Sequence, residues 1–570
     1  MADLIPAGHW YNVMATDDKP LAAKVTLKAT WARKFGNISN RVKVGGDWNA
    51  DKNFGVGLYS EDPSTAPTYR EYRYCDVPMM SNIAAYIEDN LMIPVGKDGR
   101  INLVAGLRND NTVIPGSAYG TTSSLSPRFN AKYTAFTEKT RKGSLLRELS
   151  FRASWGVAVK QPSYSVLYPT PTYIDVNTFT STASSDNVVY RAYYVLPRTI
   201  EYNSSLVWQR NRQSEVGVDF NLGGNKVSLA GFYNRTAYAY RVVSGYENMS
   251  YAYTATSSVQ GLPIPSNDRV YSLDGTTGAV TVSDRTGASP SIEVPYEVRH
   301  QYHTKTTEDN DDNPQTRYGL EWTVDFRKIS PINTVIRLDG SFYNYRSLYT
   351  DMMPYCPSTV SSYDGTPYKY VGYYYGGNTL VNGTRTRNLN VNLTLTTNIP
   401  KVRMIVSMRI ESSLMKQTQY LSDRENGTRS YVLSDKSDLM SLTDASIYDG
   451  ESYTVLFPDY YISYDDPTPQ DFLEKFRWAR DNDPELYADL SKLALTTSYL
   501  YYYRRDSISP YFSANFSVTK EIGDLASISL YVNNFFNNMS QLYSARTQTY
   551  VSVSSYVPSF YYGLTVRFKF

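Results

Sequence analysis

The last nine residues of this 570-residue chain constrain its fold more than any other stretch. In the segment 562–570, small or charged side chains alternate with the apolar side chains of Tyr562, Leu564, Val566, Phe568 and Phe570. Successive side chains of a β-strand point to opposite faces, so this strand presents one apolar face and one polar face. The segment must therefore lie between an apolar medium and water.

The same alternation recurs along the whole chain, in about fifteen segments. The charged and amide side chains on the second face are too numerous for the packed core of a β-sandwich, and they suit a hydrated lumen. The predicted strands are 22–34, 41–50, 80–93, 101–111, 125–137, 148–160, 207–222, 226–243, 315–328, 334–349, 388–396, 402–411, 512–519, 527–532 and 562–570.

The connections between these strands are alternately short and long. The short turns are rich in Gly, Pro, Asn and Asp, which supply the backbone angles of tight reversals. They lie near 36–37, 94–99, 139–146, 223–224, 330–331, 399–400 and 521–524. The long segments lie near 51–78, 112–123, 161–206, 244–313, 350–386, 420–507 and 542–557. This asymmetry predicts an all-β fold, an antiparallel transmembrane β-barrel with long extracellular loops. A large soluble β protein is the alternative.

Composition agrees with a barrel and excludes other classes. Mean hydropathy is −0.43 and the chain contains no long apolar run, which excludes transmembrane helices. A net charge of +2 gives no reason to expect nucleic acid as a partner. The 54 tyrosines, against 20 phenylalanines, have apolar rings with polar tips and suit membrane–water interfaces and binding loops.

The beginning of the chain does not match its end. Residues 1–10 contain neither a basic region nor an apolar core of the signal-peptide kind. Fifteen is an odd number, whereas bacterial barrels usually have an even number of strands, and an open sheet in lipid leaves backbone groups unpaired. We expect residues 1–20 to be part of an extracellular loop and 21–570 to be the C-terminal part of a larger barrel.

Five motifs, in this order along the chain, resemble those of the TonB-dependent outer-membrane transporters. They are Ala85–Asp89, Leu103–Arg108, Leu125–Tyr133, Leu149–Ser163 and Leu525–Asn537, the last of which contains Asn533-Asn534-Phe535-Phe536-Asn537. The terminal aromatic residues Phe568 and Phe570 resemble the C-terminal signal that the barrel-assembly machinery reads in such proteins.

The resemblance implies a 22-stranded barrel, of which this chain would supply strands 8–22, without the plug domain. It also implies the outer membrane of a Gram-negative bacterium, contact with outer-membrane lipid, and a TonB complex reached only through the missing N-terminal region. A surface lipoprotein is a possible partner. The implied function is active uptake of a scarce solute such as a siderophore, cobalamin, a glycan or a peptide. Two alternatives are a passive porin or channel, and a surface adhesin or β-rich binding protein.

Tyrosines in the long loops are the candidate ligand-binding residues, because aromatic rings beside amide and hydroxyl groups suit a glycan, a cyclic chelate or a peptide. Anchoring at the membrane interface and packing within the loops are the alternative roles. The candidates are Tyr368, Tyr370, Tyr373, Tyr374, Tyr375, Tyr460, Tyr461, Tyr501, Tyr502 and Tyr503.

A helical insertion is predicted at about 466–497, within the loop 420–507. Thr468 before Pro469, and Asp483 before Pro484, are each predicted as N-caps followed by a first-turn proline. Phe472, Phe476 and the leucines of the second helix are expected to pack together. The insertion could be a mobile gate or a static scaffold.

No enzyme, cofactor or metal site is assigned. The sequence lacks nucleophile-elbow, phosphate-loop and metalloprotease motifs, and it has only three histidines. His300-x-x-His303 and the acidic run 308–313 are weak metal signals, since neither has the ligand spacing of a known site. The two cysteines, Cys75 and Cys356, are expected to be unpaired thiols, with a disulfide as the alternative.

Overall fold

One large antiparallel sheet dominates the computed structural model, which describes residues 4–8, 11–63, 69–116, 120–168, 170–198, 203–358, 360–361, 365–536, 541–552 and 558–569. The sheet has 16 strands, of which fifteen follow one another in chain order and the short β33 (Asp506–Ile508) pairs at the side with β24. The fifteen are β3 (Pro20–Phe35), β4 (Ile38–Asn53), β6 (Met80–Val95), β7 (Gly99–Ile114), β8 (Gly120–Phe136), β9 (Leu146–Lys160), β12 (Gln209–Leu222), β13 (Asn225–Ala237), β19 (Gln315–Asp325), β20 (Thr334–Leu348), β23 (Gly383–Ile399), β24 (Met404–Leu421), β34 (Tyr511–Ile522), β35 (Ala526–Asn533) and β38 (Tyr561–Phe568).

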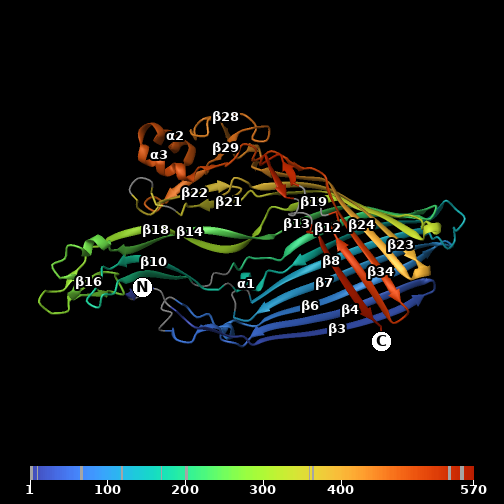
Figure 1. Ribbon diagram of the computed structural model, residues 1–570, viewed down its shortest axis with the longest axis horizontal. Coiled ribbons are helices and arrows are strands. Elements are labelled where there is room, and N and C mark those ends of the chain that lie inside the picture. The colour runs from blue at the N-terminus through green and yellow to red at the C-terminus, as the bar shows by residue number, and fades with distance from the viewer. Residues whose placement is uncertain are drawn as a thin grey trace.

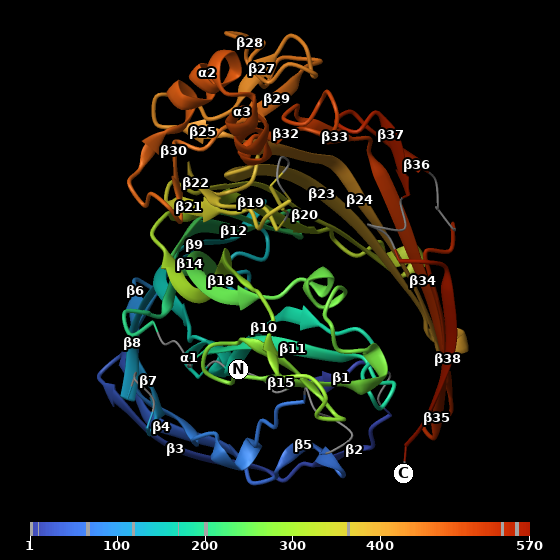
Figure 2. The ribbon, with the colours of Figure 1, turned by 90° about the vertical axis from the view of Figure 1, so that its left-hand side faces the viewer.

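The fifteen predicted barrel strands are therefore confirmed. They lie side by side in one tilted wall, with the tight turns at one end and the long loops at the other (Figure 1). Seen from the loop end, the wall curves round from β3 to β38 (Figure 2). Among the described residues, these two outer strands pair only with β4 and β35, so the sheet has two free edges.

The register keeps one set of side chains on each face across the sheet. Leu320 on β19 pairs with Gly231 on β13 and Phe342 on β20, whereas its neighbour Glu321 pairs with Ala230 and Ser341. Directly opposite residues of an antiparallel pair share a face, so each cross-strand row is either apolar or polar. Over the middle of the strands, polar side chains reach one another across an intervening strand, which places the charged face on the concave side, the lumen, and the apolar face outside.

Three sequence predictions about the wall need correction. The segment 226–243 is not one strand, because Tyr238 takes a left-handed conformation (φ 58°) and the chain leaves the wall there. Arg403 is not a wall residue, since it ends the turn after β23 with φ 48°. The supposed long segment 112–123 is largely strand, because β7 continues to Ile114 and β8 begins at Gly120.

The long loops fold into small sheets of their own, which the sequence analysis did not predict. The hairpin of β14 (Ala239–Tyr253) and β18 (Glu297–Asp311) lies with β10 (Thr172–Thr180) and β11 (Tyr190–Arg198) over the mouth of the curved wall (Figures 1 and 2). Other loop strands are β1 (Ile5–Pro6), β2 (Met14–Asp17), β5 (Gly57–Ser60), β15 (Arg269–Leu273), β16 (Val280–Asp284), β17 (Ile292–Glu293), β21 (Met352–Tyr355), β22 (Tyr370–Tyr375), β25 (Asp423–Arg424), β26 (Gly427–Thr428), β27 (Tyr431–Leu433), β28 (Leu442–Thr443), β29 (Tyr453–Leu456), β30 (Tyr460–Ser463), β31 (Gln470–Asp471), β32 (Leu495–Thr496), β36 (Gln541–Ser544) and β37 (Thr549–Ser552).

The predicted helical insertion is present as α2 (Phe472–Asn482) and α3 (Pro484–Leu490). A separate one-turn helix, α1 (Tyr164–Leu167), lies in another loop. Asp483 caps α3, as predicted, because its carboxylate accepts from the backbone N–H of Leu486 at 3.0 Å. The cap of α2 is Asp471, which accepts from the N–H of Glu474 at 2.8 Å, so the prediction of Thr468 was wrong. In the described part of the chain, no helix has the length and apolar character needed to cross a membrane.

Candidate functional site

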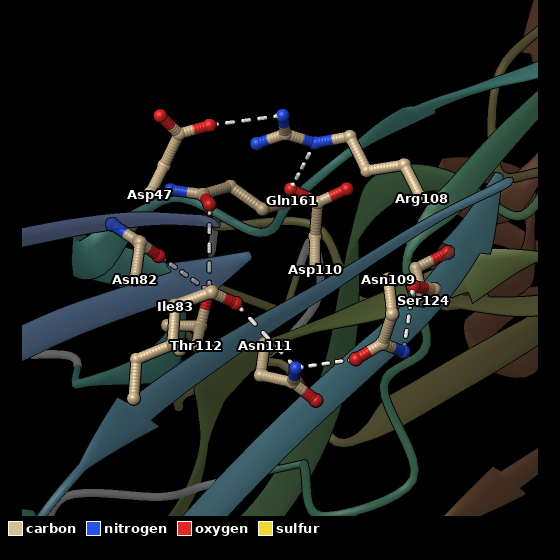
Figure 3. Close-up of polar contacts among 10 residues, drawn as sticks. All are labelled: Asp47, Asn82, Ile83, Arg108, Asn109, Asp110, Asn111, Thr112, Ser124 and Gln161. Atoms are coloured by element: carbon tan, nitrogen blue, oxygen red, sulfur yellow. Dashed lines mark hydrogen bonds and ion pairs between the residues drawn. The ribbon is translucent and has the colours of Figure 1, made fainter. Parts of the chain in front are cut away.

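A ladder of charged side chains lines the lumen near the loop end of the wall. Arg108 on β7 donates from Nε to Asp110 Oδ1 at 2.8 Å and from Nη1 to Asp47 Oδ2 at 3.1 Å (Figure 3). Asp47 belongs to β4, and β6 runs between that strand and β7. The Arg108 guanidinium therefore reaches over β6 to a carboxylate on β4, on the concave face.

The alternation of β7 is visible in the same view. Thr112 Oγ1 lies 2.6 Å from Asn82 Oδ1 and 3.4 Å from Gln161 Oε1, on the same side as Arg108 (Figure 3). Asn109 points to the opposite side, where its amide donates to the carbonyl oxygen of Ser124 at 3.3 Å (Figure 3). Both faces of β7 are thus polar at this height, while the neighbouring strands keep exposed apolar side chains, Leu125 and Ile83, on the outer face.

Similar ladders continue around the lumen. Arg152 donates to Glu215 Oε1 at 3.1 Å and to Asp219, which also accepts from Lys132 Nζ at 3.1 Å. Arg409 donates to Glu411 Oε1 at 2.8 Å. The sequence analysis predicted a lumen lined by charged side chains, and Arg152, Arg409 and Glu411 lie on that face.

A cavity of about 510 Å³ opens beside the first ladder and was missed by the sequence analysis. The residues that line it include Arg108, Asp110, Arg128, Gln161, Trp208 and Gln213. Among the residues that the structure describes, Arg128 has one carboxylate partner, Glu88, at 3.6 Å, and the Arg128 side chain is half exposed. The period-two spacing of Arg108, Asp110 and Thr112 would have identified this part of the wall, but it does not reveal which strands bring the arginines together.

Half of the candidate tyrosines lie in the cores of the loops. Tyr368 is 3% exposed and donates its hydroxyl to the carbonyl oxygen of Asp489 at 2.8 Å, and Tyr374 is fully buried and donates to that of Leu493. Burial raises the pKa of both phenols. Tyr370 and Tyr461 are also buried, and their rings meet edge to face at 5.7 Å.

Those four tyrosines pack against the helical insertion or the residues that directly follow it. Phe472, Phe476, Leu490 and Leu493 are fully buried in one cluster with Tyr368, Tyr370 and Tyr461, and Tyr487 stacks on Phe476 at 4.6 Å between ring centroids. The expected packing of the insertion is therefore confirmed. Mutual burial of large aromatic rings stabilises this loop as a folded unit.

Three other candidates remain partly exposed on the outer loops. Tyr373 on β22 and Tyr460 on β30 are directly paired and stack face to face, with ring centroids 4.6 Å apart and an angle of 12° between the rings. Tyr375 carries the guanidinium of Arg424 over its ring at 5.0 Å. These partly exposed rings lie on one four-stranded loop sheet, β21-β22-β30-β31, so they are the better placed of the predicted ligand-binding residues.

The candidates 501–503 lie in a second group. Tyr503 is buried and donates to the carbonyl oxygen of Leu380 at 2.6 Å, while its ring packs edge to face on Tyr502 at 5.2 Å. Burial raises the pKa of Tyr502 to about 12. Tyr501 is partly exposed. A role for any of these rings in ligand binding stays a prediction.

The remaining predicted residues are placed as follows. Cys75 and Cys356 are free thiols, as expected. His300 and His303 lie on β18, three residues apart and hence on opposite faces, and His300 stacks on Tyr464 at 5.3 Å. Phe568 closes β38 and is 64% exposed, whereas Phe570 lies outside the described residues. Their role as an assembly signal stays a prediction.

Comparison with solved structures finds distant likenesses. The chain is similar to the siderophore receptor PirA from Acinetobacter baumannii, with a TM-score of 0.43, 14% identity, and coverage of 96% of this chain and 55% of that one. It is also similar to the copper transporter OprC, with a TM-score of 0.41, 9% identity, and coverage of 96% and 56%. The chain thus spans about half the length of these two structures. No match was found among curated protein sequences.

A protein-family model matches the sequence over a long stretch. The model described as "TonB dependent receptor-like, beta-barrel" matches residues 2–403, which is more than half of the chain. Proteins of this family lie in the outer membrane of Gram-negative bacteria, which accounts for a wall with one apolar and one polar face. The chain belongs to the TonB-dependent receptor β-barrel family.

Proposed function

We propose that this chain forms the wall and outer mouth of a receptor that takes up a scarce solute across the outer membrane, driven by the TonB complex. The observation that carries the proposal is the combination of an ion-paired lumen wall with folded loops over its mouth. A passive porin needs only an open, wet lumen, whereas a receptor needs rigid binding surfaces at the entrance.

Two surfaces are suited to hold the solute on its way in. The stacked pair Tyr373 and Tyr460 offers aromatic faces on the outer loops. Deeper in, Arg108 and Arg128 line the 510 Å³ cavity and suit carboxylate, phosphate or catecholate oxygens. A solute with both ring-shaped and anionic parts fits these surfaces, which includes metal chelates, acidic glycans and acidic peptides.

The helical insertion is proposed as a gate beside the aromatic surface. Support comes from its core, which is shared with Tyr370 and Tyr461 of the two strands that carry the aromatic pair. A movement of α2 and α3 would therefore displace the pair. Hydrogen exchange of 472–490 with and without the solute tests this. Slower exchange with solute is expected for a gate, and an unchanged rate means that the insertion is a static scaffold.

Growth on single limiting nutrients tests the proposed function. We expect deletion of the gene to abolish growth on one class among ferric chelates, copper, cobalamin, glycans and peptides, and the wild-type gene to restore it. The double variant Y373A/Y460A should restore growth only at raised solute concentrations. Y318A/Y233A is the matched control, since these two rings lie on the outer face of the wall and should not matter. Full growth of the deletion strain on every class would contradict the proposal.

A further inference from the structure

The outer face of the wall carries a row of arginines at its loop end. Arg212 on β12 lies directly opposite Arg235 on β13, which pairs with Thr316 on β19. Thr316 pairs with Arg346 on β20, and Arg346 pairs with Arg385 on β23. Paired residues share a face, so these side chains form one row across five strands, about 19 Å wide at ~4.8 Å per strand. We call it the arginine row: Arg212, Arg235, Arg346 and Arg385.

The face on which the row lies is fixed by the next row toward the turns. Two residues along each strand, Ser214 pairs with Trp155 and Tyr233, and Tyr233 pairs with Tyr318. These three rings are 45%, 47% and 49% exposed, and the following row contains Val216 and Leu320, which are 65% and 58% exposed. Such exposed apolar surface belongs in lipid, so the arginine row stands on the lipid-facing side. Aromatic rings lie directly below it on β13 and β19, and the same lower row continues with Asn344 on β20 and Arg387 on β23.

The height of the row matches the edge of the hydrocarbon layer. Arg212 is ten residues from Leu222, the last residue of β12 at the turn end. At ~3.4 Å per residue and a strand tilt of roughly 40°, that distance corresponds to about 26 Å, close to the ~25 Å of an outer-membrane apolar band. The guanidinium groups therefore lie at the depth of lipid head groups in the leaflet on the loop side.

The charges of the row are poorly compensated within the protein. Like charges directly opposite each other destabilise a strand pair, yet Arg212 and Arg235 are so placed. In the described ranges, the row makes a single ion pair, from Arg346 to Asp423 at 3.8 Å. Just above the row, Arg210 has a buried Nε without a hydrogen-bond partner in the described protein. Four cations in a line, with one distant carboxylate, give the outer face a local excess of positive charge.

We propose that the arginine row is a binding site for phosphate-bearing lipid head groups of the outer leaflet. Arginine holds phosphate oxygens through two parallel N–H bonds, and neighbouring rows supply aromatic and aliphatic contacts for the acyl chains below. A lipid, rather than free phosphate, is the occupant because the row continues the lipid-facing surface without a break. The site lies on the opposite face of the wall from the lumen, so it does not depend on which solute is taken up.

Native mass spectrometry of the full chain in detergent micelles tests the proposal. The probes are diphosphoryl lipid A, monophosphoryl lipid A and phosphatidylethanolamine. We expect the wild type to bind them in that order of affinity. A basic residue near a lipid surface contributes about fivefold, so the row variant R212Q/R235Q/R346Q/R385Q should bind diphosphoryl lipid A at least tenfold more weakly.

The matched control removes the same charge from the other end of the wall. Lys97, Arg327, Lys328 and Lys401 are exposed residues in the tight turns, and K97Q/R327Q/K328Q/K401Q should keep wild-type affinity. Equal losses in the row and control variants would overturn the proposal, because net charge alone would then explain binding. It would also be overturned if millimolar inorganic phosphate displaced the lipid completely, since the site would then be one for free phosphate. If the row variant fails to show the heat-dependent mobility of a folded barrel, R212Q/R235Q replaces it, with an expected loss of about fivefold or more.

Discussion

Tyr86 on β6 lies directly opposite Gly45 on β4, and its ring fills the space that a side chain at position 45 would need. An ideal Cβ at position 45 would lie 2.5 Å from Tyr86 Oη, which is far inside van der Waals contact. Glycine at this position therefore lets an aromatic ring lie flat on the lumen face of the next strand.

The first prediction follows from this contact. Gly45→Ala should lower the stability of the wall by about 1–3 kcal/mol, because the ring of Tyr86 must leave its position. The midpoint of the heat-induced change in gel mobility measures the effect. Gly46→Ala is the control, since its Cβ would meet only the carbonyl oxygen of Ala84 at 3.4 Å. Equal shifts for the two variants would contradict the role of the ring.

The second prediction concerns the caps of the helical insertion. Asp483→Ala should destabilise α3 by about 1 kcal/mol, since the N–H of Leu486 loses its acceptor. Hydrogen exchange of 484–490 should become roughly fivefold faster. Asp481→Ala removes an equal charge from an exposed position near the end of α2 and should leave the exchange unchanged. If both variants behave alike, charge rather than capping explains the effect.

The third prediction concerns thiol reactivity. Burial raises the pKa of the Cys356 thiol to about 12, so at pH 8 only about one thiol in ten thousand is ionised. Alkylation by iodoacetamide, followed by mass spectrometry, should therefore modify Cys356 much more slowly than Cys75. In denaturant the two should react alike. Rapid modification of Cys356 in the folded protein would show that its surroundings are not those described.

The fourth prediction tests which face of the wall meets water. In a background with both native cysteines replaced by serine, single cysteines at 390, 392 and 394 should react with a charged maleimide in outer-membrane vesicles. Cysteines at 391, 393 and 395 should be protected, because Val391, Leu393 and Leu395 lie on the apolar face of β23. Reaction at all six positions, or at none, would contradict the assignment of the two faces.

The wall could be predicted from sequence because alternation is local and each tight turn carries its own Gly, Pro or Asn signal. Gly223 and Gly224, for example, have φ of 61° and 97°, as a tight reversal requires. The break at Tyr238 could not be predicted, since tyrosine rarely adopts a positive φ. Thr468 carried a valid cap signal too, but the pairing of Asp471 with Tyr460 extends β31 to that residue and delays the helix.

The loops were less predictable because their pairing depends on distant partners. The 15-residue strands β14 and β18 are as long as wall strands, and nothing near Tyr240 or His303 in the sequence marks them as a loop hairpin. The chain leaves the wall at Tyr238, the left-handed residue before β14. For a similar reason, the tyrosine clusters did not reveal that Tyr374 is buried while Tyr373, one residue earlier, is partly exposed.

Energy dependence of uptake tests the central claim most directly. With the limiting solute identified by growth, initial uptake of the labelled solute is measured in cells with and without a functional TonB complex, at rising solute concentration. We expect saturable uptake that disappears without TonB, while surface binding of the solute remains. Uptake that rises in proportion to concentration and continues without TonB would contradict the account and identify a passive channel.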